Sequence, residues 1–137
     1  MLVVDASVLV VALADDGPDG DQARARLRGE QLAAPELLDV EVASVLRRQV
    51  RLGATAARRA DLALADLAAA PLARAPHQPL LARCWELRDN LTIYDAAYLE
   101  LAERQRFALA TLDADLVRAA RAEGIALIEK KEHRKGR

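Results

Sequence analysis

The chain has 137 residues (14.9 kDa), a length typical of one domain that buries a hydrophobic core of its own. Its 20 basic and 21 acidic residues give a net charge of −1, which excludes a strongly basic protein that coats nucleic acids. The single cysteine excludes an internal disulfide, and two histidines exclude a His-rich metal site.

The sequence shows neither a membrane span nor a secretion signal. Its apolar stretches are far shorter than the ~20 residues that cross a bilayer. The N-terminus lacks the basic and apolar pattern of a signal peptide. We therefore expect a cytoplasmic protein that does not associate with membranes.

Short apolar runs alternate with helical spacings along most of the chain. In chain order, the patterns predict a strand at 2–4, a helix at 7–15, a turn at 17–20, a helix at 22–28, a strand at 31–34, a helix at 36–52, a helix capped by Thr55 that runs to 70, a strand at 72–75, helices at 79–88 and 92–106, a strand at 108–112, a helix at 114–123 and a last strand at 125–128. This alternation predicts an α/β fold, a three-layer sandwich with a mainly parallel central sheet flanked by helices. We expect one domain over residues 1–128 and a charged, flexible tail at 129–137.

Two aspartates stand where a predicted strand gives way to a helix. Asp5 follows Leu2-Val3-Val4, and Asp113 follows the strand that ends at Leu112. Each can simply cap the next helix. However, the carboxyl ends of parallel strands share one edge of a sheet, where ligands bind in open α/β folds. Asp115, two residues later, is either an accessory carboxylate or an acid that favours the positive helix N-terminus.

Two more acids lie on predicted helices beside apolar positions. Glu41 shares a helix face with Leu37 and Leu38, where an unpaired carboxylate is costly. Its partner could be Arg48, two turns further on, or a metal ion. Asp95 follows Thr92 at the spacing of a capping box, but the small residues Ala96 and Ala97 leave room for a ligand.

The four carboxylates together carry more information than any one of them. A cluster of three or four acids repels itself unless a cation is bound. Oxygen ligands without companion cysteine or histidine select Mg²⁺ or Mn²⁺ rather than zinc. Such a site can activate water and stabilise the transition state of phosphodiester cleavage.

The order of these motifs resembles the PIN-domain ribonucleases, and the likeness is closest to VapC toxins of bacterial VapBC toxin–antitoxin pairs. The matching segments cover nearly the whole chain, from Met1 to about Ile128, and are Val-Val-Asp5-Ala-Ser7, Glu41 on a helix, Tyr94-Asp95-Ala-Ala-Tyr98 and Thr111-Leu-Asp113-Ala-Asp115. The resemblance implies a metal-dependent endoribonuclease that cuts structured RNA, tRNA or rRNA.

The resemblance also implies roles for individual residues and partners. The catalytic and metal-binding acids would be Asp5, Glu41, Asp95 and Asp113, with Asp115 as an auxiliary metal ligand. Ser7 and Thr111 would orient the site through hydrogen bonds. Proteins of this kind form homodimers and are held inactive by a small VapB-type antitoxin.

An acidic site that cleaves RNA needs basic residues nearby to attract the phosphates. Arg47, Arg48 and Arg51 are candidates, followed by Arg58 and Arg59; each could equally be a solvated residue on an outer helix face. Because only 3% of residues are aromatic, stacking along an extended strand should not dominate, which favours recognition of folded RNA by shape. Trp85 and Tyr98 are expected in the core or at a dimer surface.

Two other functional classes also share features of this sequence. A receiver-like phosphoacceptor domain shares the parallel sheet, the strand-end aspartate and Thr111, but leaves Glu41 unexplained and lacks a second acid beside Asp5. A catalytically degenerate binding module would keep the fold without metal-dependent stabilisation.

Overall fold

The computed structural model describes residues 1–128, and the predicted tail at 129–137 lies outside them. Its centre is a sheet of four parallel strands in the order β3-β2-β1-β4. The strands are β1 (Leu2–Val4), β2 (Leu32–Pro35), β3 (Leu72–Ala75) and β4 (Ala108–Ala110). A parallel sheet needs helical crossovers, and every connection between these strands contains at least one helix.

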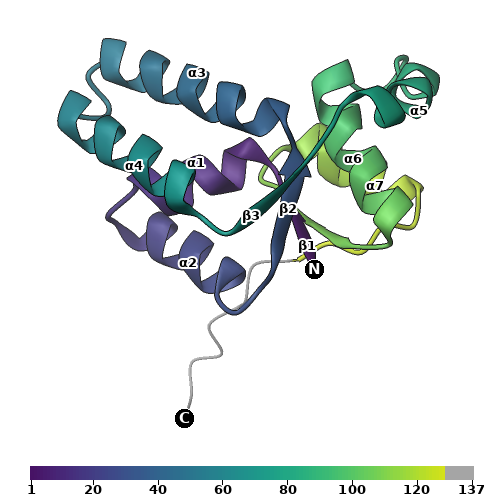
Figure 1. The fold of residues 1–137 in the computed structure, drawn as a ribbon, viewed down its shortest axis with the longest axis horizontal. Coiled ribbons are helices and arrows are strands. Elements are labelled where there is room, and N and C mark those ends of the chain that lie inside the picture. The colour runs from purple at the N-terminus through teal and green to yellow at the C-terminus, as the bar shows by residue number, and fades with distance from the viewer. Residues whose placement is uncertain (129–137) are drawn as a thin grey trace.

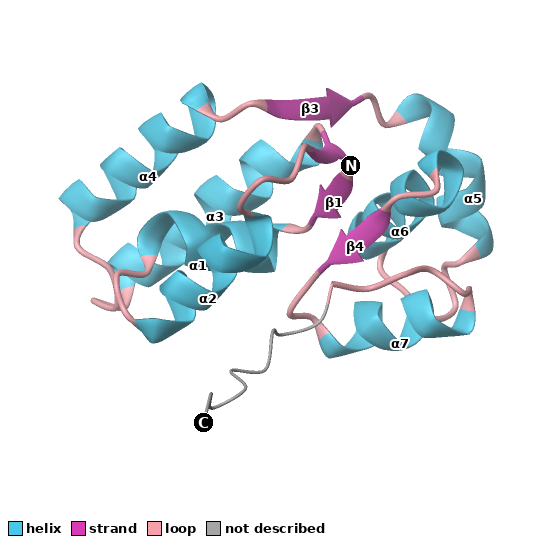
Figure 2. Cartoon of the chain, turned by 90° about the horizontal axis from the view of Figure 1, so that it is seen from below, coloured by secondary structure: helices cyan, strands magenta, loops and turns pink. Residues whose placement is uncertain are grey.

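Helices cover both faces of the sheet (Figures 1 and 2). One group consists of α1 (Ala6–Ala14), α2 (Pro18–Leu27), α3 (Leu37–Arg51) and α4 (Ala57–Ala69). The other consists of the 3₁₀ turn η1 (Gln78–Leu80), α5 (Leu81–Glu86), α6 (Ile93–Gln105) and α7 (Ala114–Ala122). The predicted three-layer α/β sandwich is therefore confirmed.

Part of the core lies where β1 and α6 meet. Leu2, Val3 and Val4 are almost completely buried because helices pack on both faces of the central strand. Helix α6 contacts β1, β2 and β4, and seven consecutive residues from Ala96 to Ala102 are buried. This packing fixes the position of Asp95, which lies one position before the buried run.

Helix α2 begins earlier than predicted, because the turn expected at residues 17–20 is its first turn. Pro18 occupies a first-turn position, where its missing N–H costs no hydrogen bond. The Asp15 carboxylate accepts hydrogen bonds from the backbone N–H groups of Gly17 (2.7 Å) and Gly20 (3.3 Å). Gly20 is required there, since a Cβ atom would lie 1.8 Å from the Asp15 carbonyl oxygen.

Thr55 does not cap the next helix. Its hydroxyl donates to the Gln49 side chain (2.9 Å), and α4 is instead preceded by Ala56, which has no side chain able to cap it. The turn that ends α3 at Gly53 (φ 75°) brings Thr55 back to Gln49. The predicted cap is therefore wrong.

The predicted strands at 108–112 and 125–128 are shorter in the structure. The backbone N–H of Leu112 leaves the ladder to donate to Ser7 Oγ (3.0 Å), so β4 ends at Ala110. The last segment forms an isolated parallel bridge between Leu109 and Leu127. The helix predicted at 79–88 is likewise divided into η1 and α5.

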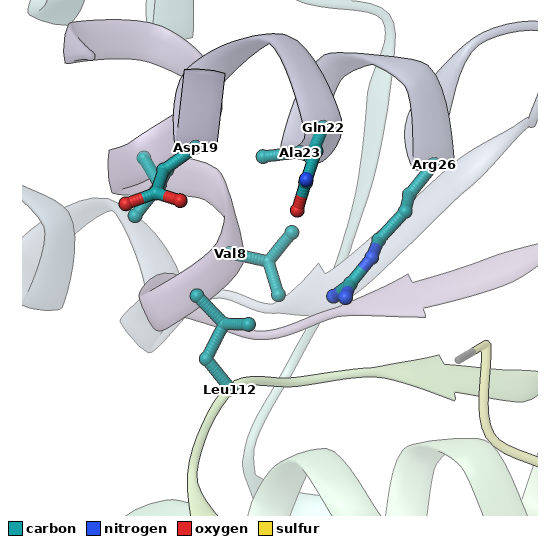
Figure 3. A pocket seen from close by; sticks show the side chains of 7 residues that line it. Val8, Asp19, Gln22, Ala23, Arg26 and Leu112 are labelled. Carbon is teal, nitrogen blue, oxygen red and sulfur yellow. The ribbon is translucent and has the colours of Figure 1, made fainter. Parts of the chain in front are cut away.

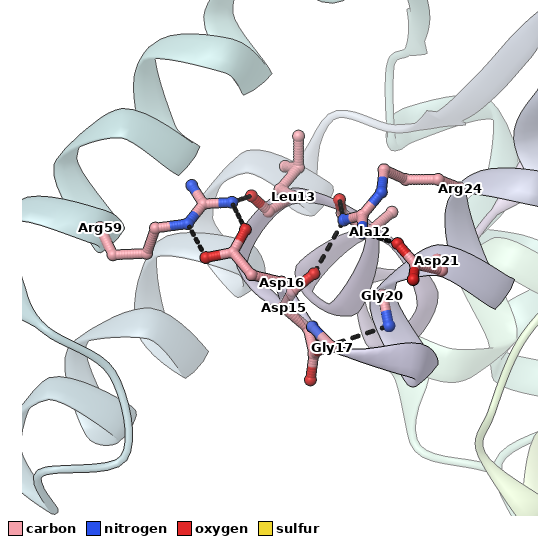
Figure 4. A network of polar contacts seen from close by, with 9 residues as sticks. All are labelled: Ala12, Leu13, Asp15, Asp16, Gly17, Gly20, Asp21, Arg24 and Arg59. Carbon is pink, nitrogen blue, oxygen red and sulfur yellow. Dashed lines mark hydrogen bonds and ion pairs between the residues drawn. The ribbon is translucent and has the colours of Figure 1, made fainter.

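Arginines from two other helices hold the C-terminal end of α1 (Figure 4). Arg59 of α4 donates to both oxygens of Asp16 (3.0 Å each) and to the Leu13 carbonyl (2.8 Å). Arg24 of α2 donates to the carbonyls of Ala12 (2.9 Å) and Asp15 (2.8 Å). These contacts satisfy carbonyls that the end of a helix leaves unpaired.

No helix within residues 1–128 is long and apolar enough to cross a membrane.

Candidate active site

The carboxylate of Asp5 is buried at the carboxyl edge of the sheet. Asp5 caps α1, its side chain accepting a hydrogen bond from the Ser7 backbone N–H, and its other carboxylate oxygen accepts from the Thr111 hydroxyl. Only 5% of the residue is exposed. Capping and burial together hold this carboxylate in one orientation.

The loop after β4 is tied to the same place. The Thr111 hydroxyl accepts from the Asp113 backbone N–H (3.0 Å) while donating to Asp5. Ser7 Oγ accepts from the backbone N–H of Leu112. Asp113 caps α7 by accepting from the Leu116 N–H (2.9 Å). Asp5 and Asp113 are thus helix caps, and the hydrogen bonds of Thr111 join them.

Glu41 reaches the site from α3. It is half-buried, and Glu41 Oε1 accepts a hydrogen bond from the Tyr98 hydroxyl of α6 (2.8 Å). Tyr98 is 1% exposed. The partner of Glu41 is therefore Tyr98, and the ion pair considered with Arg48 does not form. Sequence patterns indicated a core or dimer residue at Tyr98, but not its contact with Glu41.

Asp95 lies in the first turn of α6, beyond the Thr92 cap. Thr92 Oγ1 accepts from the Asp95 backbone N–H (3.1 Å), which confirms the predicted cap. A pocket of about 390 Å³ contains both Asp95 and Asp115, lined also by residues 88–92. Asp115 is exposed and forms an ion pair with Arg118.

The acids of the site influence one another electrostatically. Burial raises the pKa of the Asp5 carboxyl above its ordinary value, and repulsion from Asp113 adds to the rise against the hydrogen bonds from Thr111 and Ser7. Burial also raises the pKa of Glu41, with contributions from Asp5 and Asp95. The pKa of Asp95 is raised by burial and by Asp113 and Asp5. These mutual effects place the four predicted acids in one electrostatic neighbourhood.

Their donor chemistry suits a hard divalent cation. Asp5, Glu41, Asp95 and Asp113 form no ion pair with an arginine or lysine among residues 1–128. Carboxylate oxygens that repel one another are what Mg²⁺ and Mn²⁺ neutralise. Over the same residues, however, no three acidic, histidine or cysteine side chains are gathered closely enough to hold an ion as they stand.

A second pocket lies between α1, α2 and Leu112 (Figure 3). It measures about 250 Å³ and is lined by Val8, Val11, Asp19, Gln22, Ala23, Arg26 and Leu112. The Nε atom of Arg26 is buried without a hydrogen-bond partner among the described residues. Sequence patterns gave no signal for this pocket, because they could not show that α2 lies beside Leu112.

The predicted RNA-binding arginines lie away from the carboxylates. Arg47, Arg48 and Arg51 are exposed on the C-terminal half of α3, and Arg58 is exposed on α4. Arg59 donates hydrogen bonds to Asp16 and to the Leu13 carbonyl, which gives it a structural role. Its role in RNA binding stays a prediction.

Comparison with known proteins adds independent information. A family model described as the PIN domain matches residues 2–122. The chain is 45% identical over 116 residues to Ribonuclease VapC9 of Mycobacterium tuberculosis H37Rv, covering 82% of this chain and 86% of the relative. It is 42% identical over 118 residues to Ribonuclease VapC3 of the same strain, covering 86% of each.

Solved structures show the same fold. The chain aligns with Mycobacterium tuberculosis VapC20, described as a sarcin–ricin loop cleaving toxin, at a TM-score of 0.70 and 15% identity, covering 87% of this chain and 95% of that one. Alignment with FitAcB from Neisseria gonorrhoeae gives a TM-score of 0.69 at 14% identity, covering 95% and 98%. The family match overturns the receiver-like alternative. By these matches and the motifs above, the chain belongs to the PIN-domain family and, within it, to the VapC ribonucleases.

Proposed function

We propose that this chain is a divalent-metal-dependent endoribonuclease and the toxin of a toxin–antitoxin pair, with residues 1–128 acting as one nuclease domain. The observation that carries the proposal is a set of four carboxylates, Asp5, Glu41, Asp95 and Asp113, that form no ion pair with an arginine or lysine within those residues. Burial and mutual repulsion raise the pKa values of Asp5, Glu41 and Asp95. Relatives named VapC ribonucleases, at 40–45% identity, support it.

Asp5, Glu41, Asp95 and Asp113 would hold Mg²⁺ or Mn²⁺, and Asp115 would assist after releasing Arg118. When bound, a divalent cation supplies positive charge beside the scissile phosphate and lowers the pKa of a coordinated water. Thr111 and Ser7 keep Asp5 and the loop after β4 in place. Tyr98 would restrain the orientation of Glu41 through its hydrogen bond to that side chain.

RNA is the proposed substrate, and structured RNA such as tRNA or rRNA fits a chain with few aromatic residues. Arg47, Arg48 and Arg51 would attract its phosphates, since they are exposed and unpaired within residues 1–128. A VapB-type antitoxin and a second copy of the chain are the proposed protein partners.

The test is to incubate antitoxin-free protein with total bacterial RNA in Mn²⁺ or EDTA and to sequence the new RNA ends. Asp5→Asn is the control, because it keeps the shape and capping ability of the side chain but removes its charge. A few discrete ends that need both Mn²⁺ and Asp5 support the proposal. Ends that persist in EDTA or with Asp5→Asn contradict it. If no ends form and Mn²⁺ does not bind, the chain is a degenerate binding module.

A further inference from the structure

The single tryptophan of the chain is exposed to solvent. Trp85, on α5, is 62% exposed, although the sequence suggested a core or dimer residue. Tyr94, one residue before Asp95, is 64% exposed. Large aromatic side chains usually contribute buried area to a core, so the exposure of the only tryptophan is informative.

An arginine covers the ring of Trp85. The Arg88 guanidinium carbon lies 4.7 Å from the centre of the indole, and Arg88 Nη1 donates to the Trp85 carbonyl (2.9 Å). No acidic residue of the described chain forms an ion pair with Arg88. The guanidinium is therefore held by the aromatic ring and one backbone oxygen, which leaves other donors available.

This stacked pair adjoins the proposed catalytic centre. Arg88 lines the pocket of about 390 Å³ that also contains Asp95 and Asp115. The segment between Arg88 and Asp95 is the short connection from α5 to the cap of α6. A group bound against Arg88 would thus lie beside an acid of the site.

The polar lining of the pocket distinguishes a nucleobase from a phosphate. Asp89, which is not among the proposed metal ligands, repels a phosphate but accepts hydrogen bonds from the amino and imino groups of a base. Asn90 and Thr92 also line it and can donate or accept. Unpaired bases of RNA loops stack on aromatic rings and on the planar guanidinium of arginine, which matches the Trp85–Arg88 pair.

We propose that Trp85 and Arg88 form a stacking platform for an unpaired RNA base that flanks the cleaved bond, with the edge of that base read from the Asp95 pocket. This proposal rests on the proposed ribonuclease function, since it assigns part of the substrate. One platform of this kind agrees with recognition of a folded RNA that presents one base from a loop.

The platform can be tested without cleavage, because Trp85 is the only tryptophan and its fluorescence reports directly on stacking. Wild-type protein in EDTA is titrated with short 2′-O-methyl oligonucleotides of one base type, and with an abasic oligonucleotide of equal charge. We expect saturable quenching by the base-containing strands and none by the abasic strand. Equal quenching by both, or none by either, overturns the proposal.

Variants test the platform during cleavage at the mapped sites. Stacking of one base on one aromatic side chain strengthens RNA binding by about 5-fold to 150-fold. Trp85→Ala should therefore raise KM by that factor. Trp85→Phe should keep most of the affinity, and Arg88→Lys should lose part of it because lysine lacks a planar group. Leu81→Ala, an exposed apolar change on the same helix, is the control and should match wild type. An unchanged KM for Trp85→Ala contradicts the platform.

A second copy of the chain is the competing occupant of this surface. If Trp85→Ala and Leu81→Ala convert a dimer into monomers, with fluorescence that follows protein concentration and not RNA, the surface is a dimer contact and the proposal is wrong. Base-dependent quenching in a wild-type protein that cleaves no RNA would retain the platform and refute the proposed catalysis. Metal-dependent cleavage without base-dependent quenching would support the proposed catalysis and refute the platform.

Discussion

The two ends of α1 carry aspartates in opposite electrostatic surroundings. At the C-terminal end, Asp16 is paired with Arg59, and hydrogen bonding to that guanidinium lowers the pKa of the carboxyl (Figure 4). At the N-terminal end, Asp5 is buried beside other acids without an arginine or lysine partner in the described chain, and its pKa is raised. The same residue type is thus paired with an arginine at one end and left without a cationic partner among residues 1–128 at the other.

Under the proposed function, this contrast separates residues that stabilise the fold from residues that take part in the reaction. Natural folds pair buried or half-buried charges where they only need stability. A cluster of acids with raised pKa values and fixed orientations is typical of a functional site, because it costs stability unless a ligand compensates. Asp5, Glu41 and Asp95 have raised pKa values, whereas the pKa of Asp16 is lowered.

The largest expected difference between the two ends is in RNA cleavage. Replacing a residue that only supports a metal ligand costs about 10-fold to 100-fold, so Asp5→Asn, which removes a ligand charge, should cost at least about 100-fold. Asp16→Asn removes an equivalent charge from the other end of α1 and should cleave at the wild-type rate. The measurement is the initial rate on a mapped RNA site in Mn²⁺. Equal losses in both variants would mean that the two ends do not differ in function.

Tyr98→Phe tests whether the hydrogen bond to Glu41 serves the reaction or only the fold. It removes the hydroxyl that donates to Glu41 and leaves that half-buried oxygen without its partner. We expect kcat to fall about 10-fold through misorientation of Glu41, and the free energy of unfolding to fall by about 1 kcal/mol.

Tyr94→Phe is the matched control, because that hydroxyl belongs to an exposed tyrosine on the same helix. A loss of stability without any change in kcat or in Mn²⁺ dependence would show that the Tyr98 hydroxyl has only a structural role.

The pH dependence of stability should have opposite signs at the two ends. Folding raises the pKa values of Asp5, Glu41 and Asp95, so in EDTA their contribution is fully present below their ordinary pKa values and is lost as the pH rises through the raised ones. Folding lowers the pKa of Asp16, so its contribution is present above the ordinary value and is lost as the pH falls through the lowered one.

Chemical denaturation between about pH 3 and about pH 8 measures both effects. Asp5→Asn should reduce the loss of stability on the neutral side, and Asp16→Asn should reduce the loss on the acidic side. If Asp5→Asn instead reduces only the acidic loss, the pKa of Asp5 is lowered by folding and its assignment as an unpaired acid is wrong.

The smallest effect is expected for Arg59→Ala. This change removes the ion pair with Asp16 and the hydrogen bond to Leu13 that together join α4 to α1. The melting temperature should fall modestly, because the pair is exposed to solvent, and the cleavage rate should not change. A cleavage defect that exceeds the fraction of unfolded protein would instead favour the first interpretation of Arg59 as an RNA-binding residue.

Most of the fold could be predicted because strand and helix patterns alternate clearly along the chain. The apolar run before Asp5 and the capping signal at Thr92 placed two acids correctly, since both signals are local. The predictions for the first turn of α2 and the start of α4 were wrong, because Asp15 and Gln49 accept hydrogen bonds across turns that spacing does not reveal.

The site could be predicted only as a set of acids. Their partners required tertiary structure: Tyr98 is 57 residues from Glu41, and Thr111 is 106 residues from Asp5. The position of Trp85 on the surface beside the Asp95 pocket was also beyond sequence patterns. An isolated tryptophan in a helix is ordinarily taken as a core residue, and only the packing of α5 shows otherwise.

Direct measurement of Mn²⁺ binding by calorimetry tests most closely whether the unpaired acids form a metal site. Wild-type protein, Asp5→Asn and Asp16→Asn are titrated under identical conditions, without RNA. We predict that wild type and Asp16→Asn bind Mn²⁺ with equal affinity and that Asp5→Asn loses at least about 100-fold. Equal binding by all three proteins would contradict the assignment of Asp5 and its neighbouring acids as the metal centre.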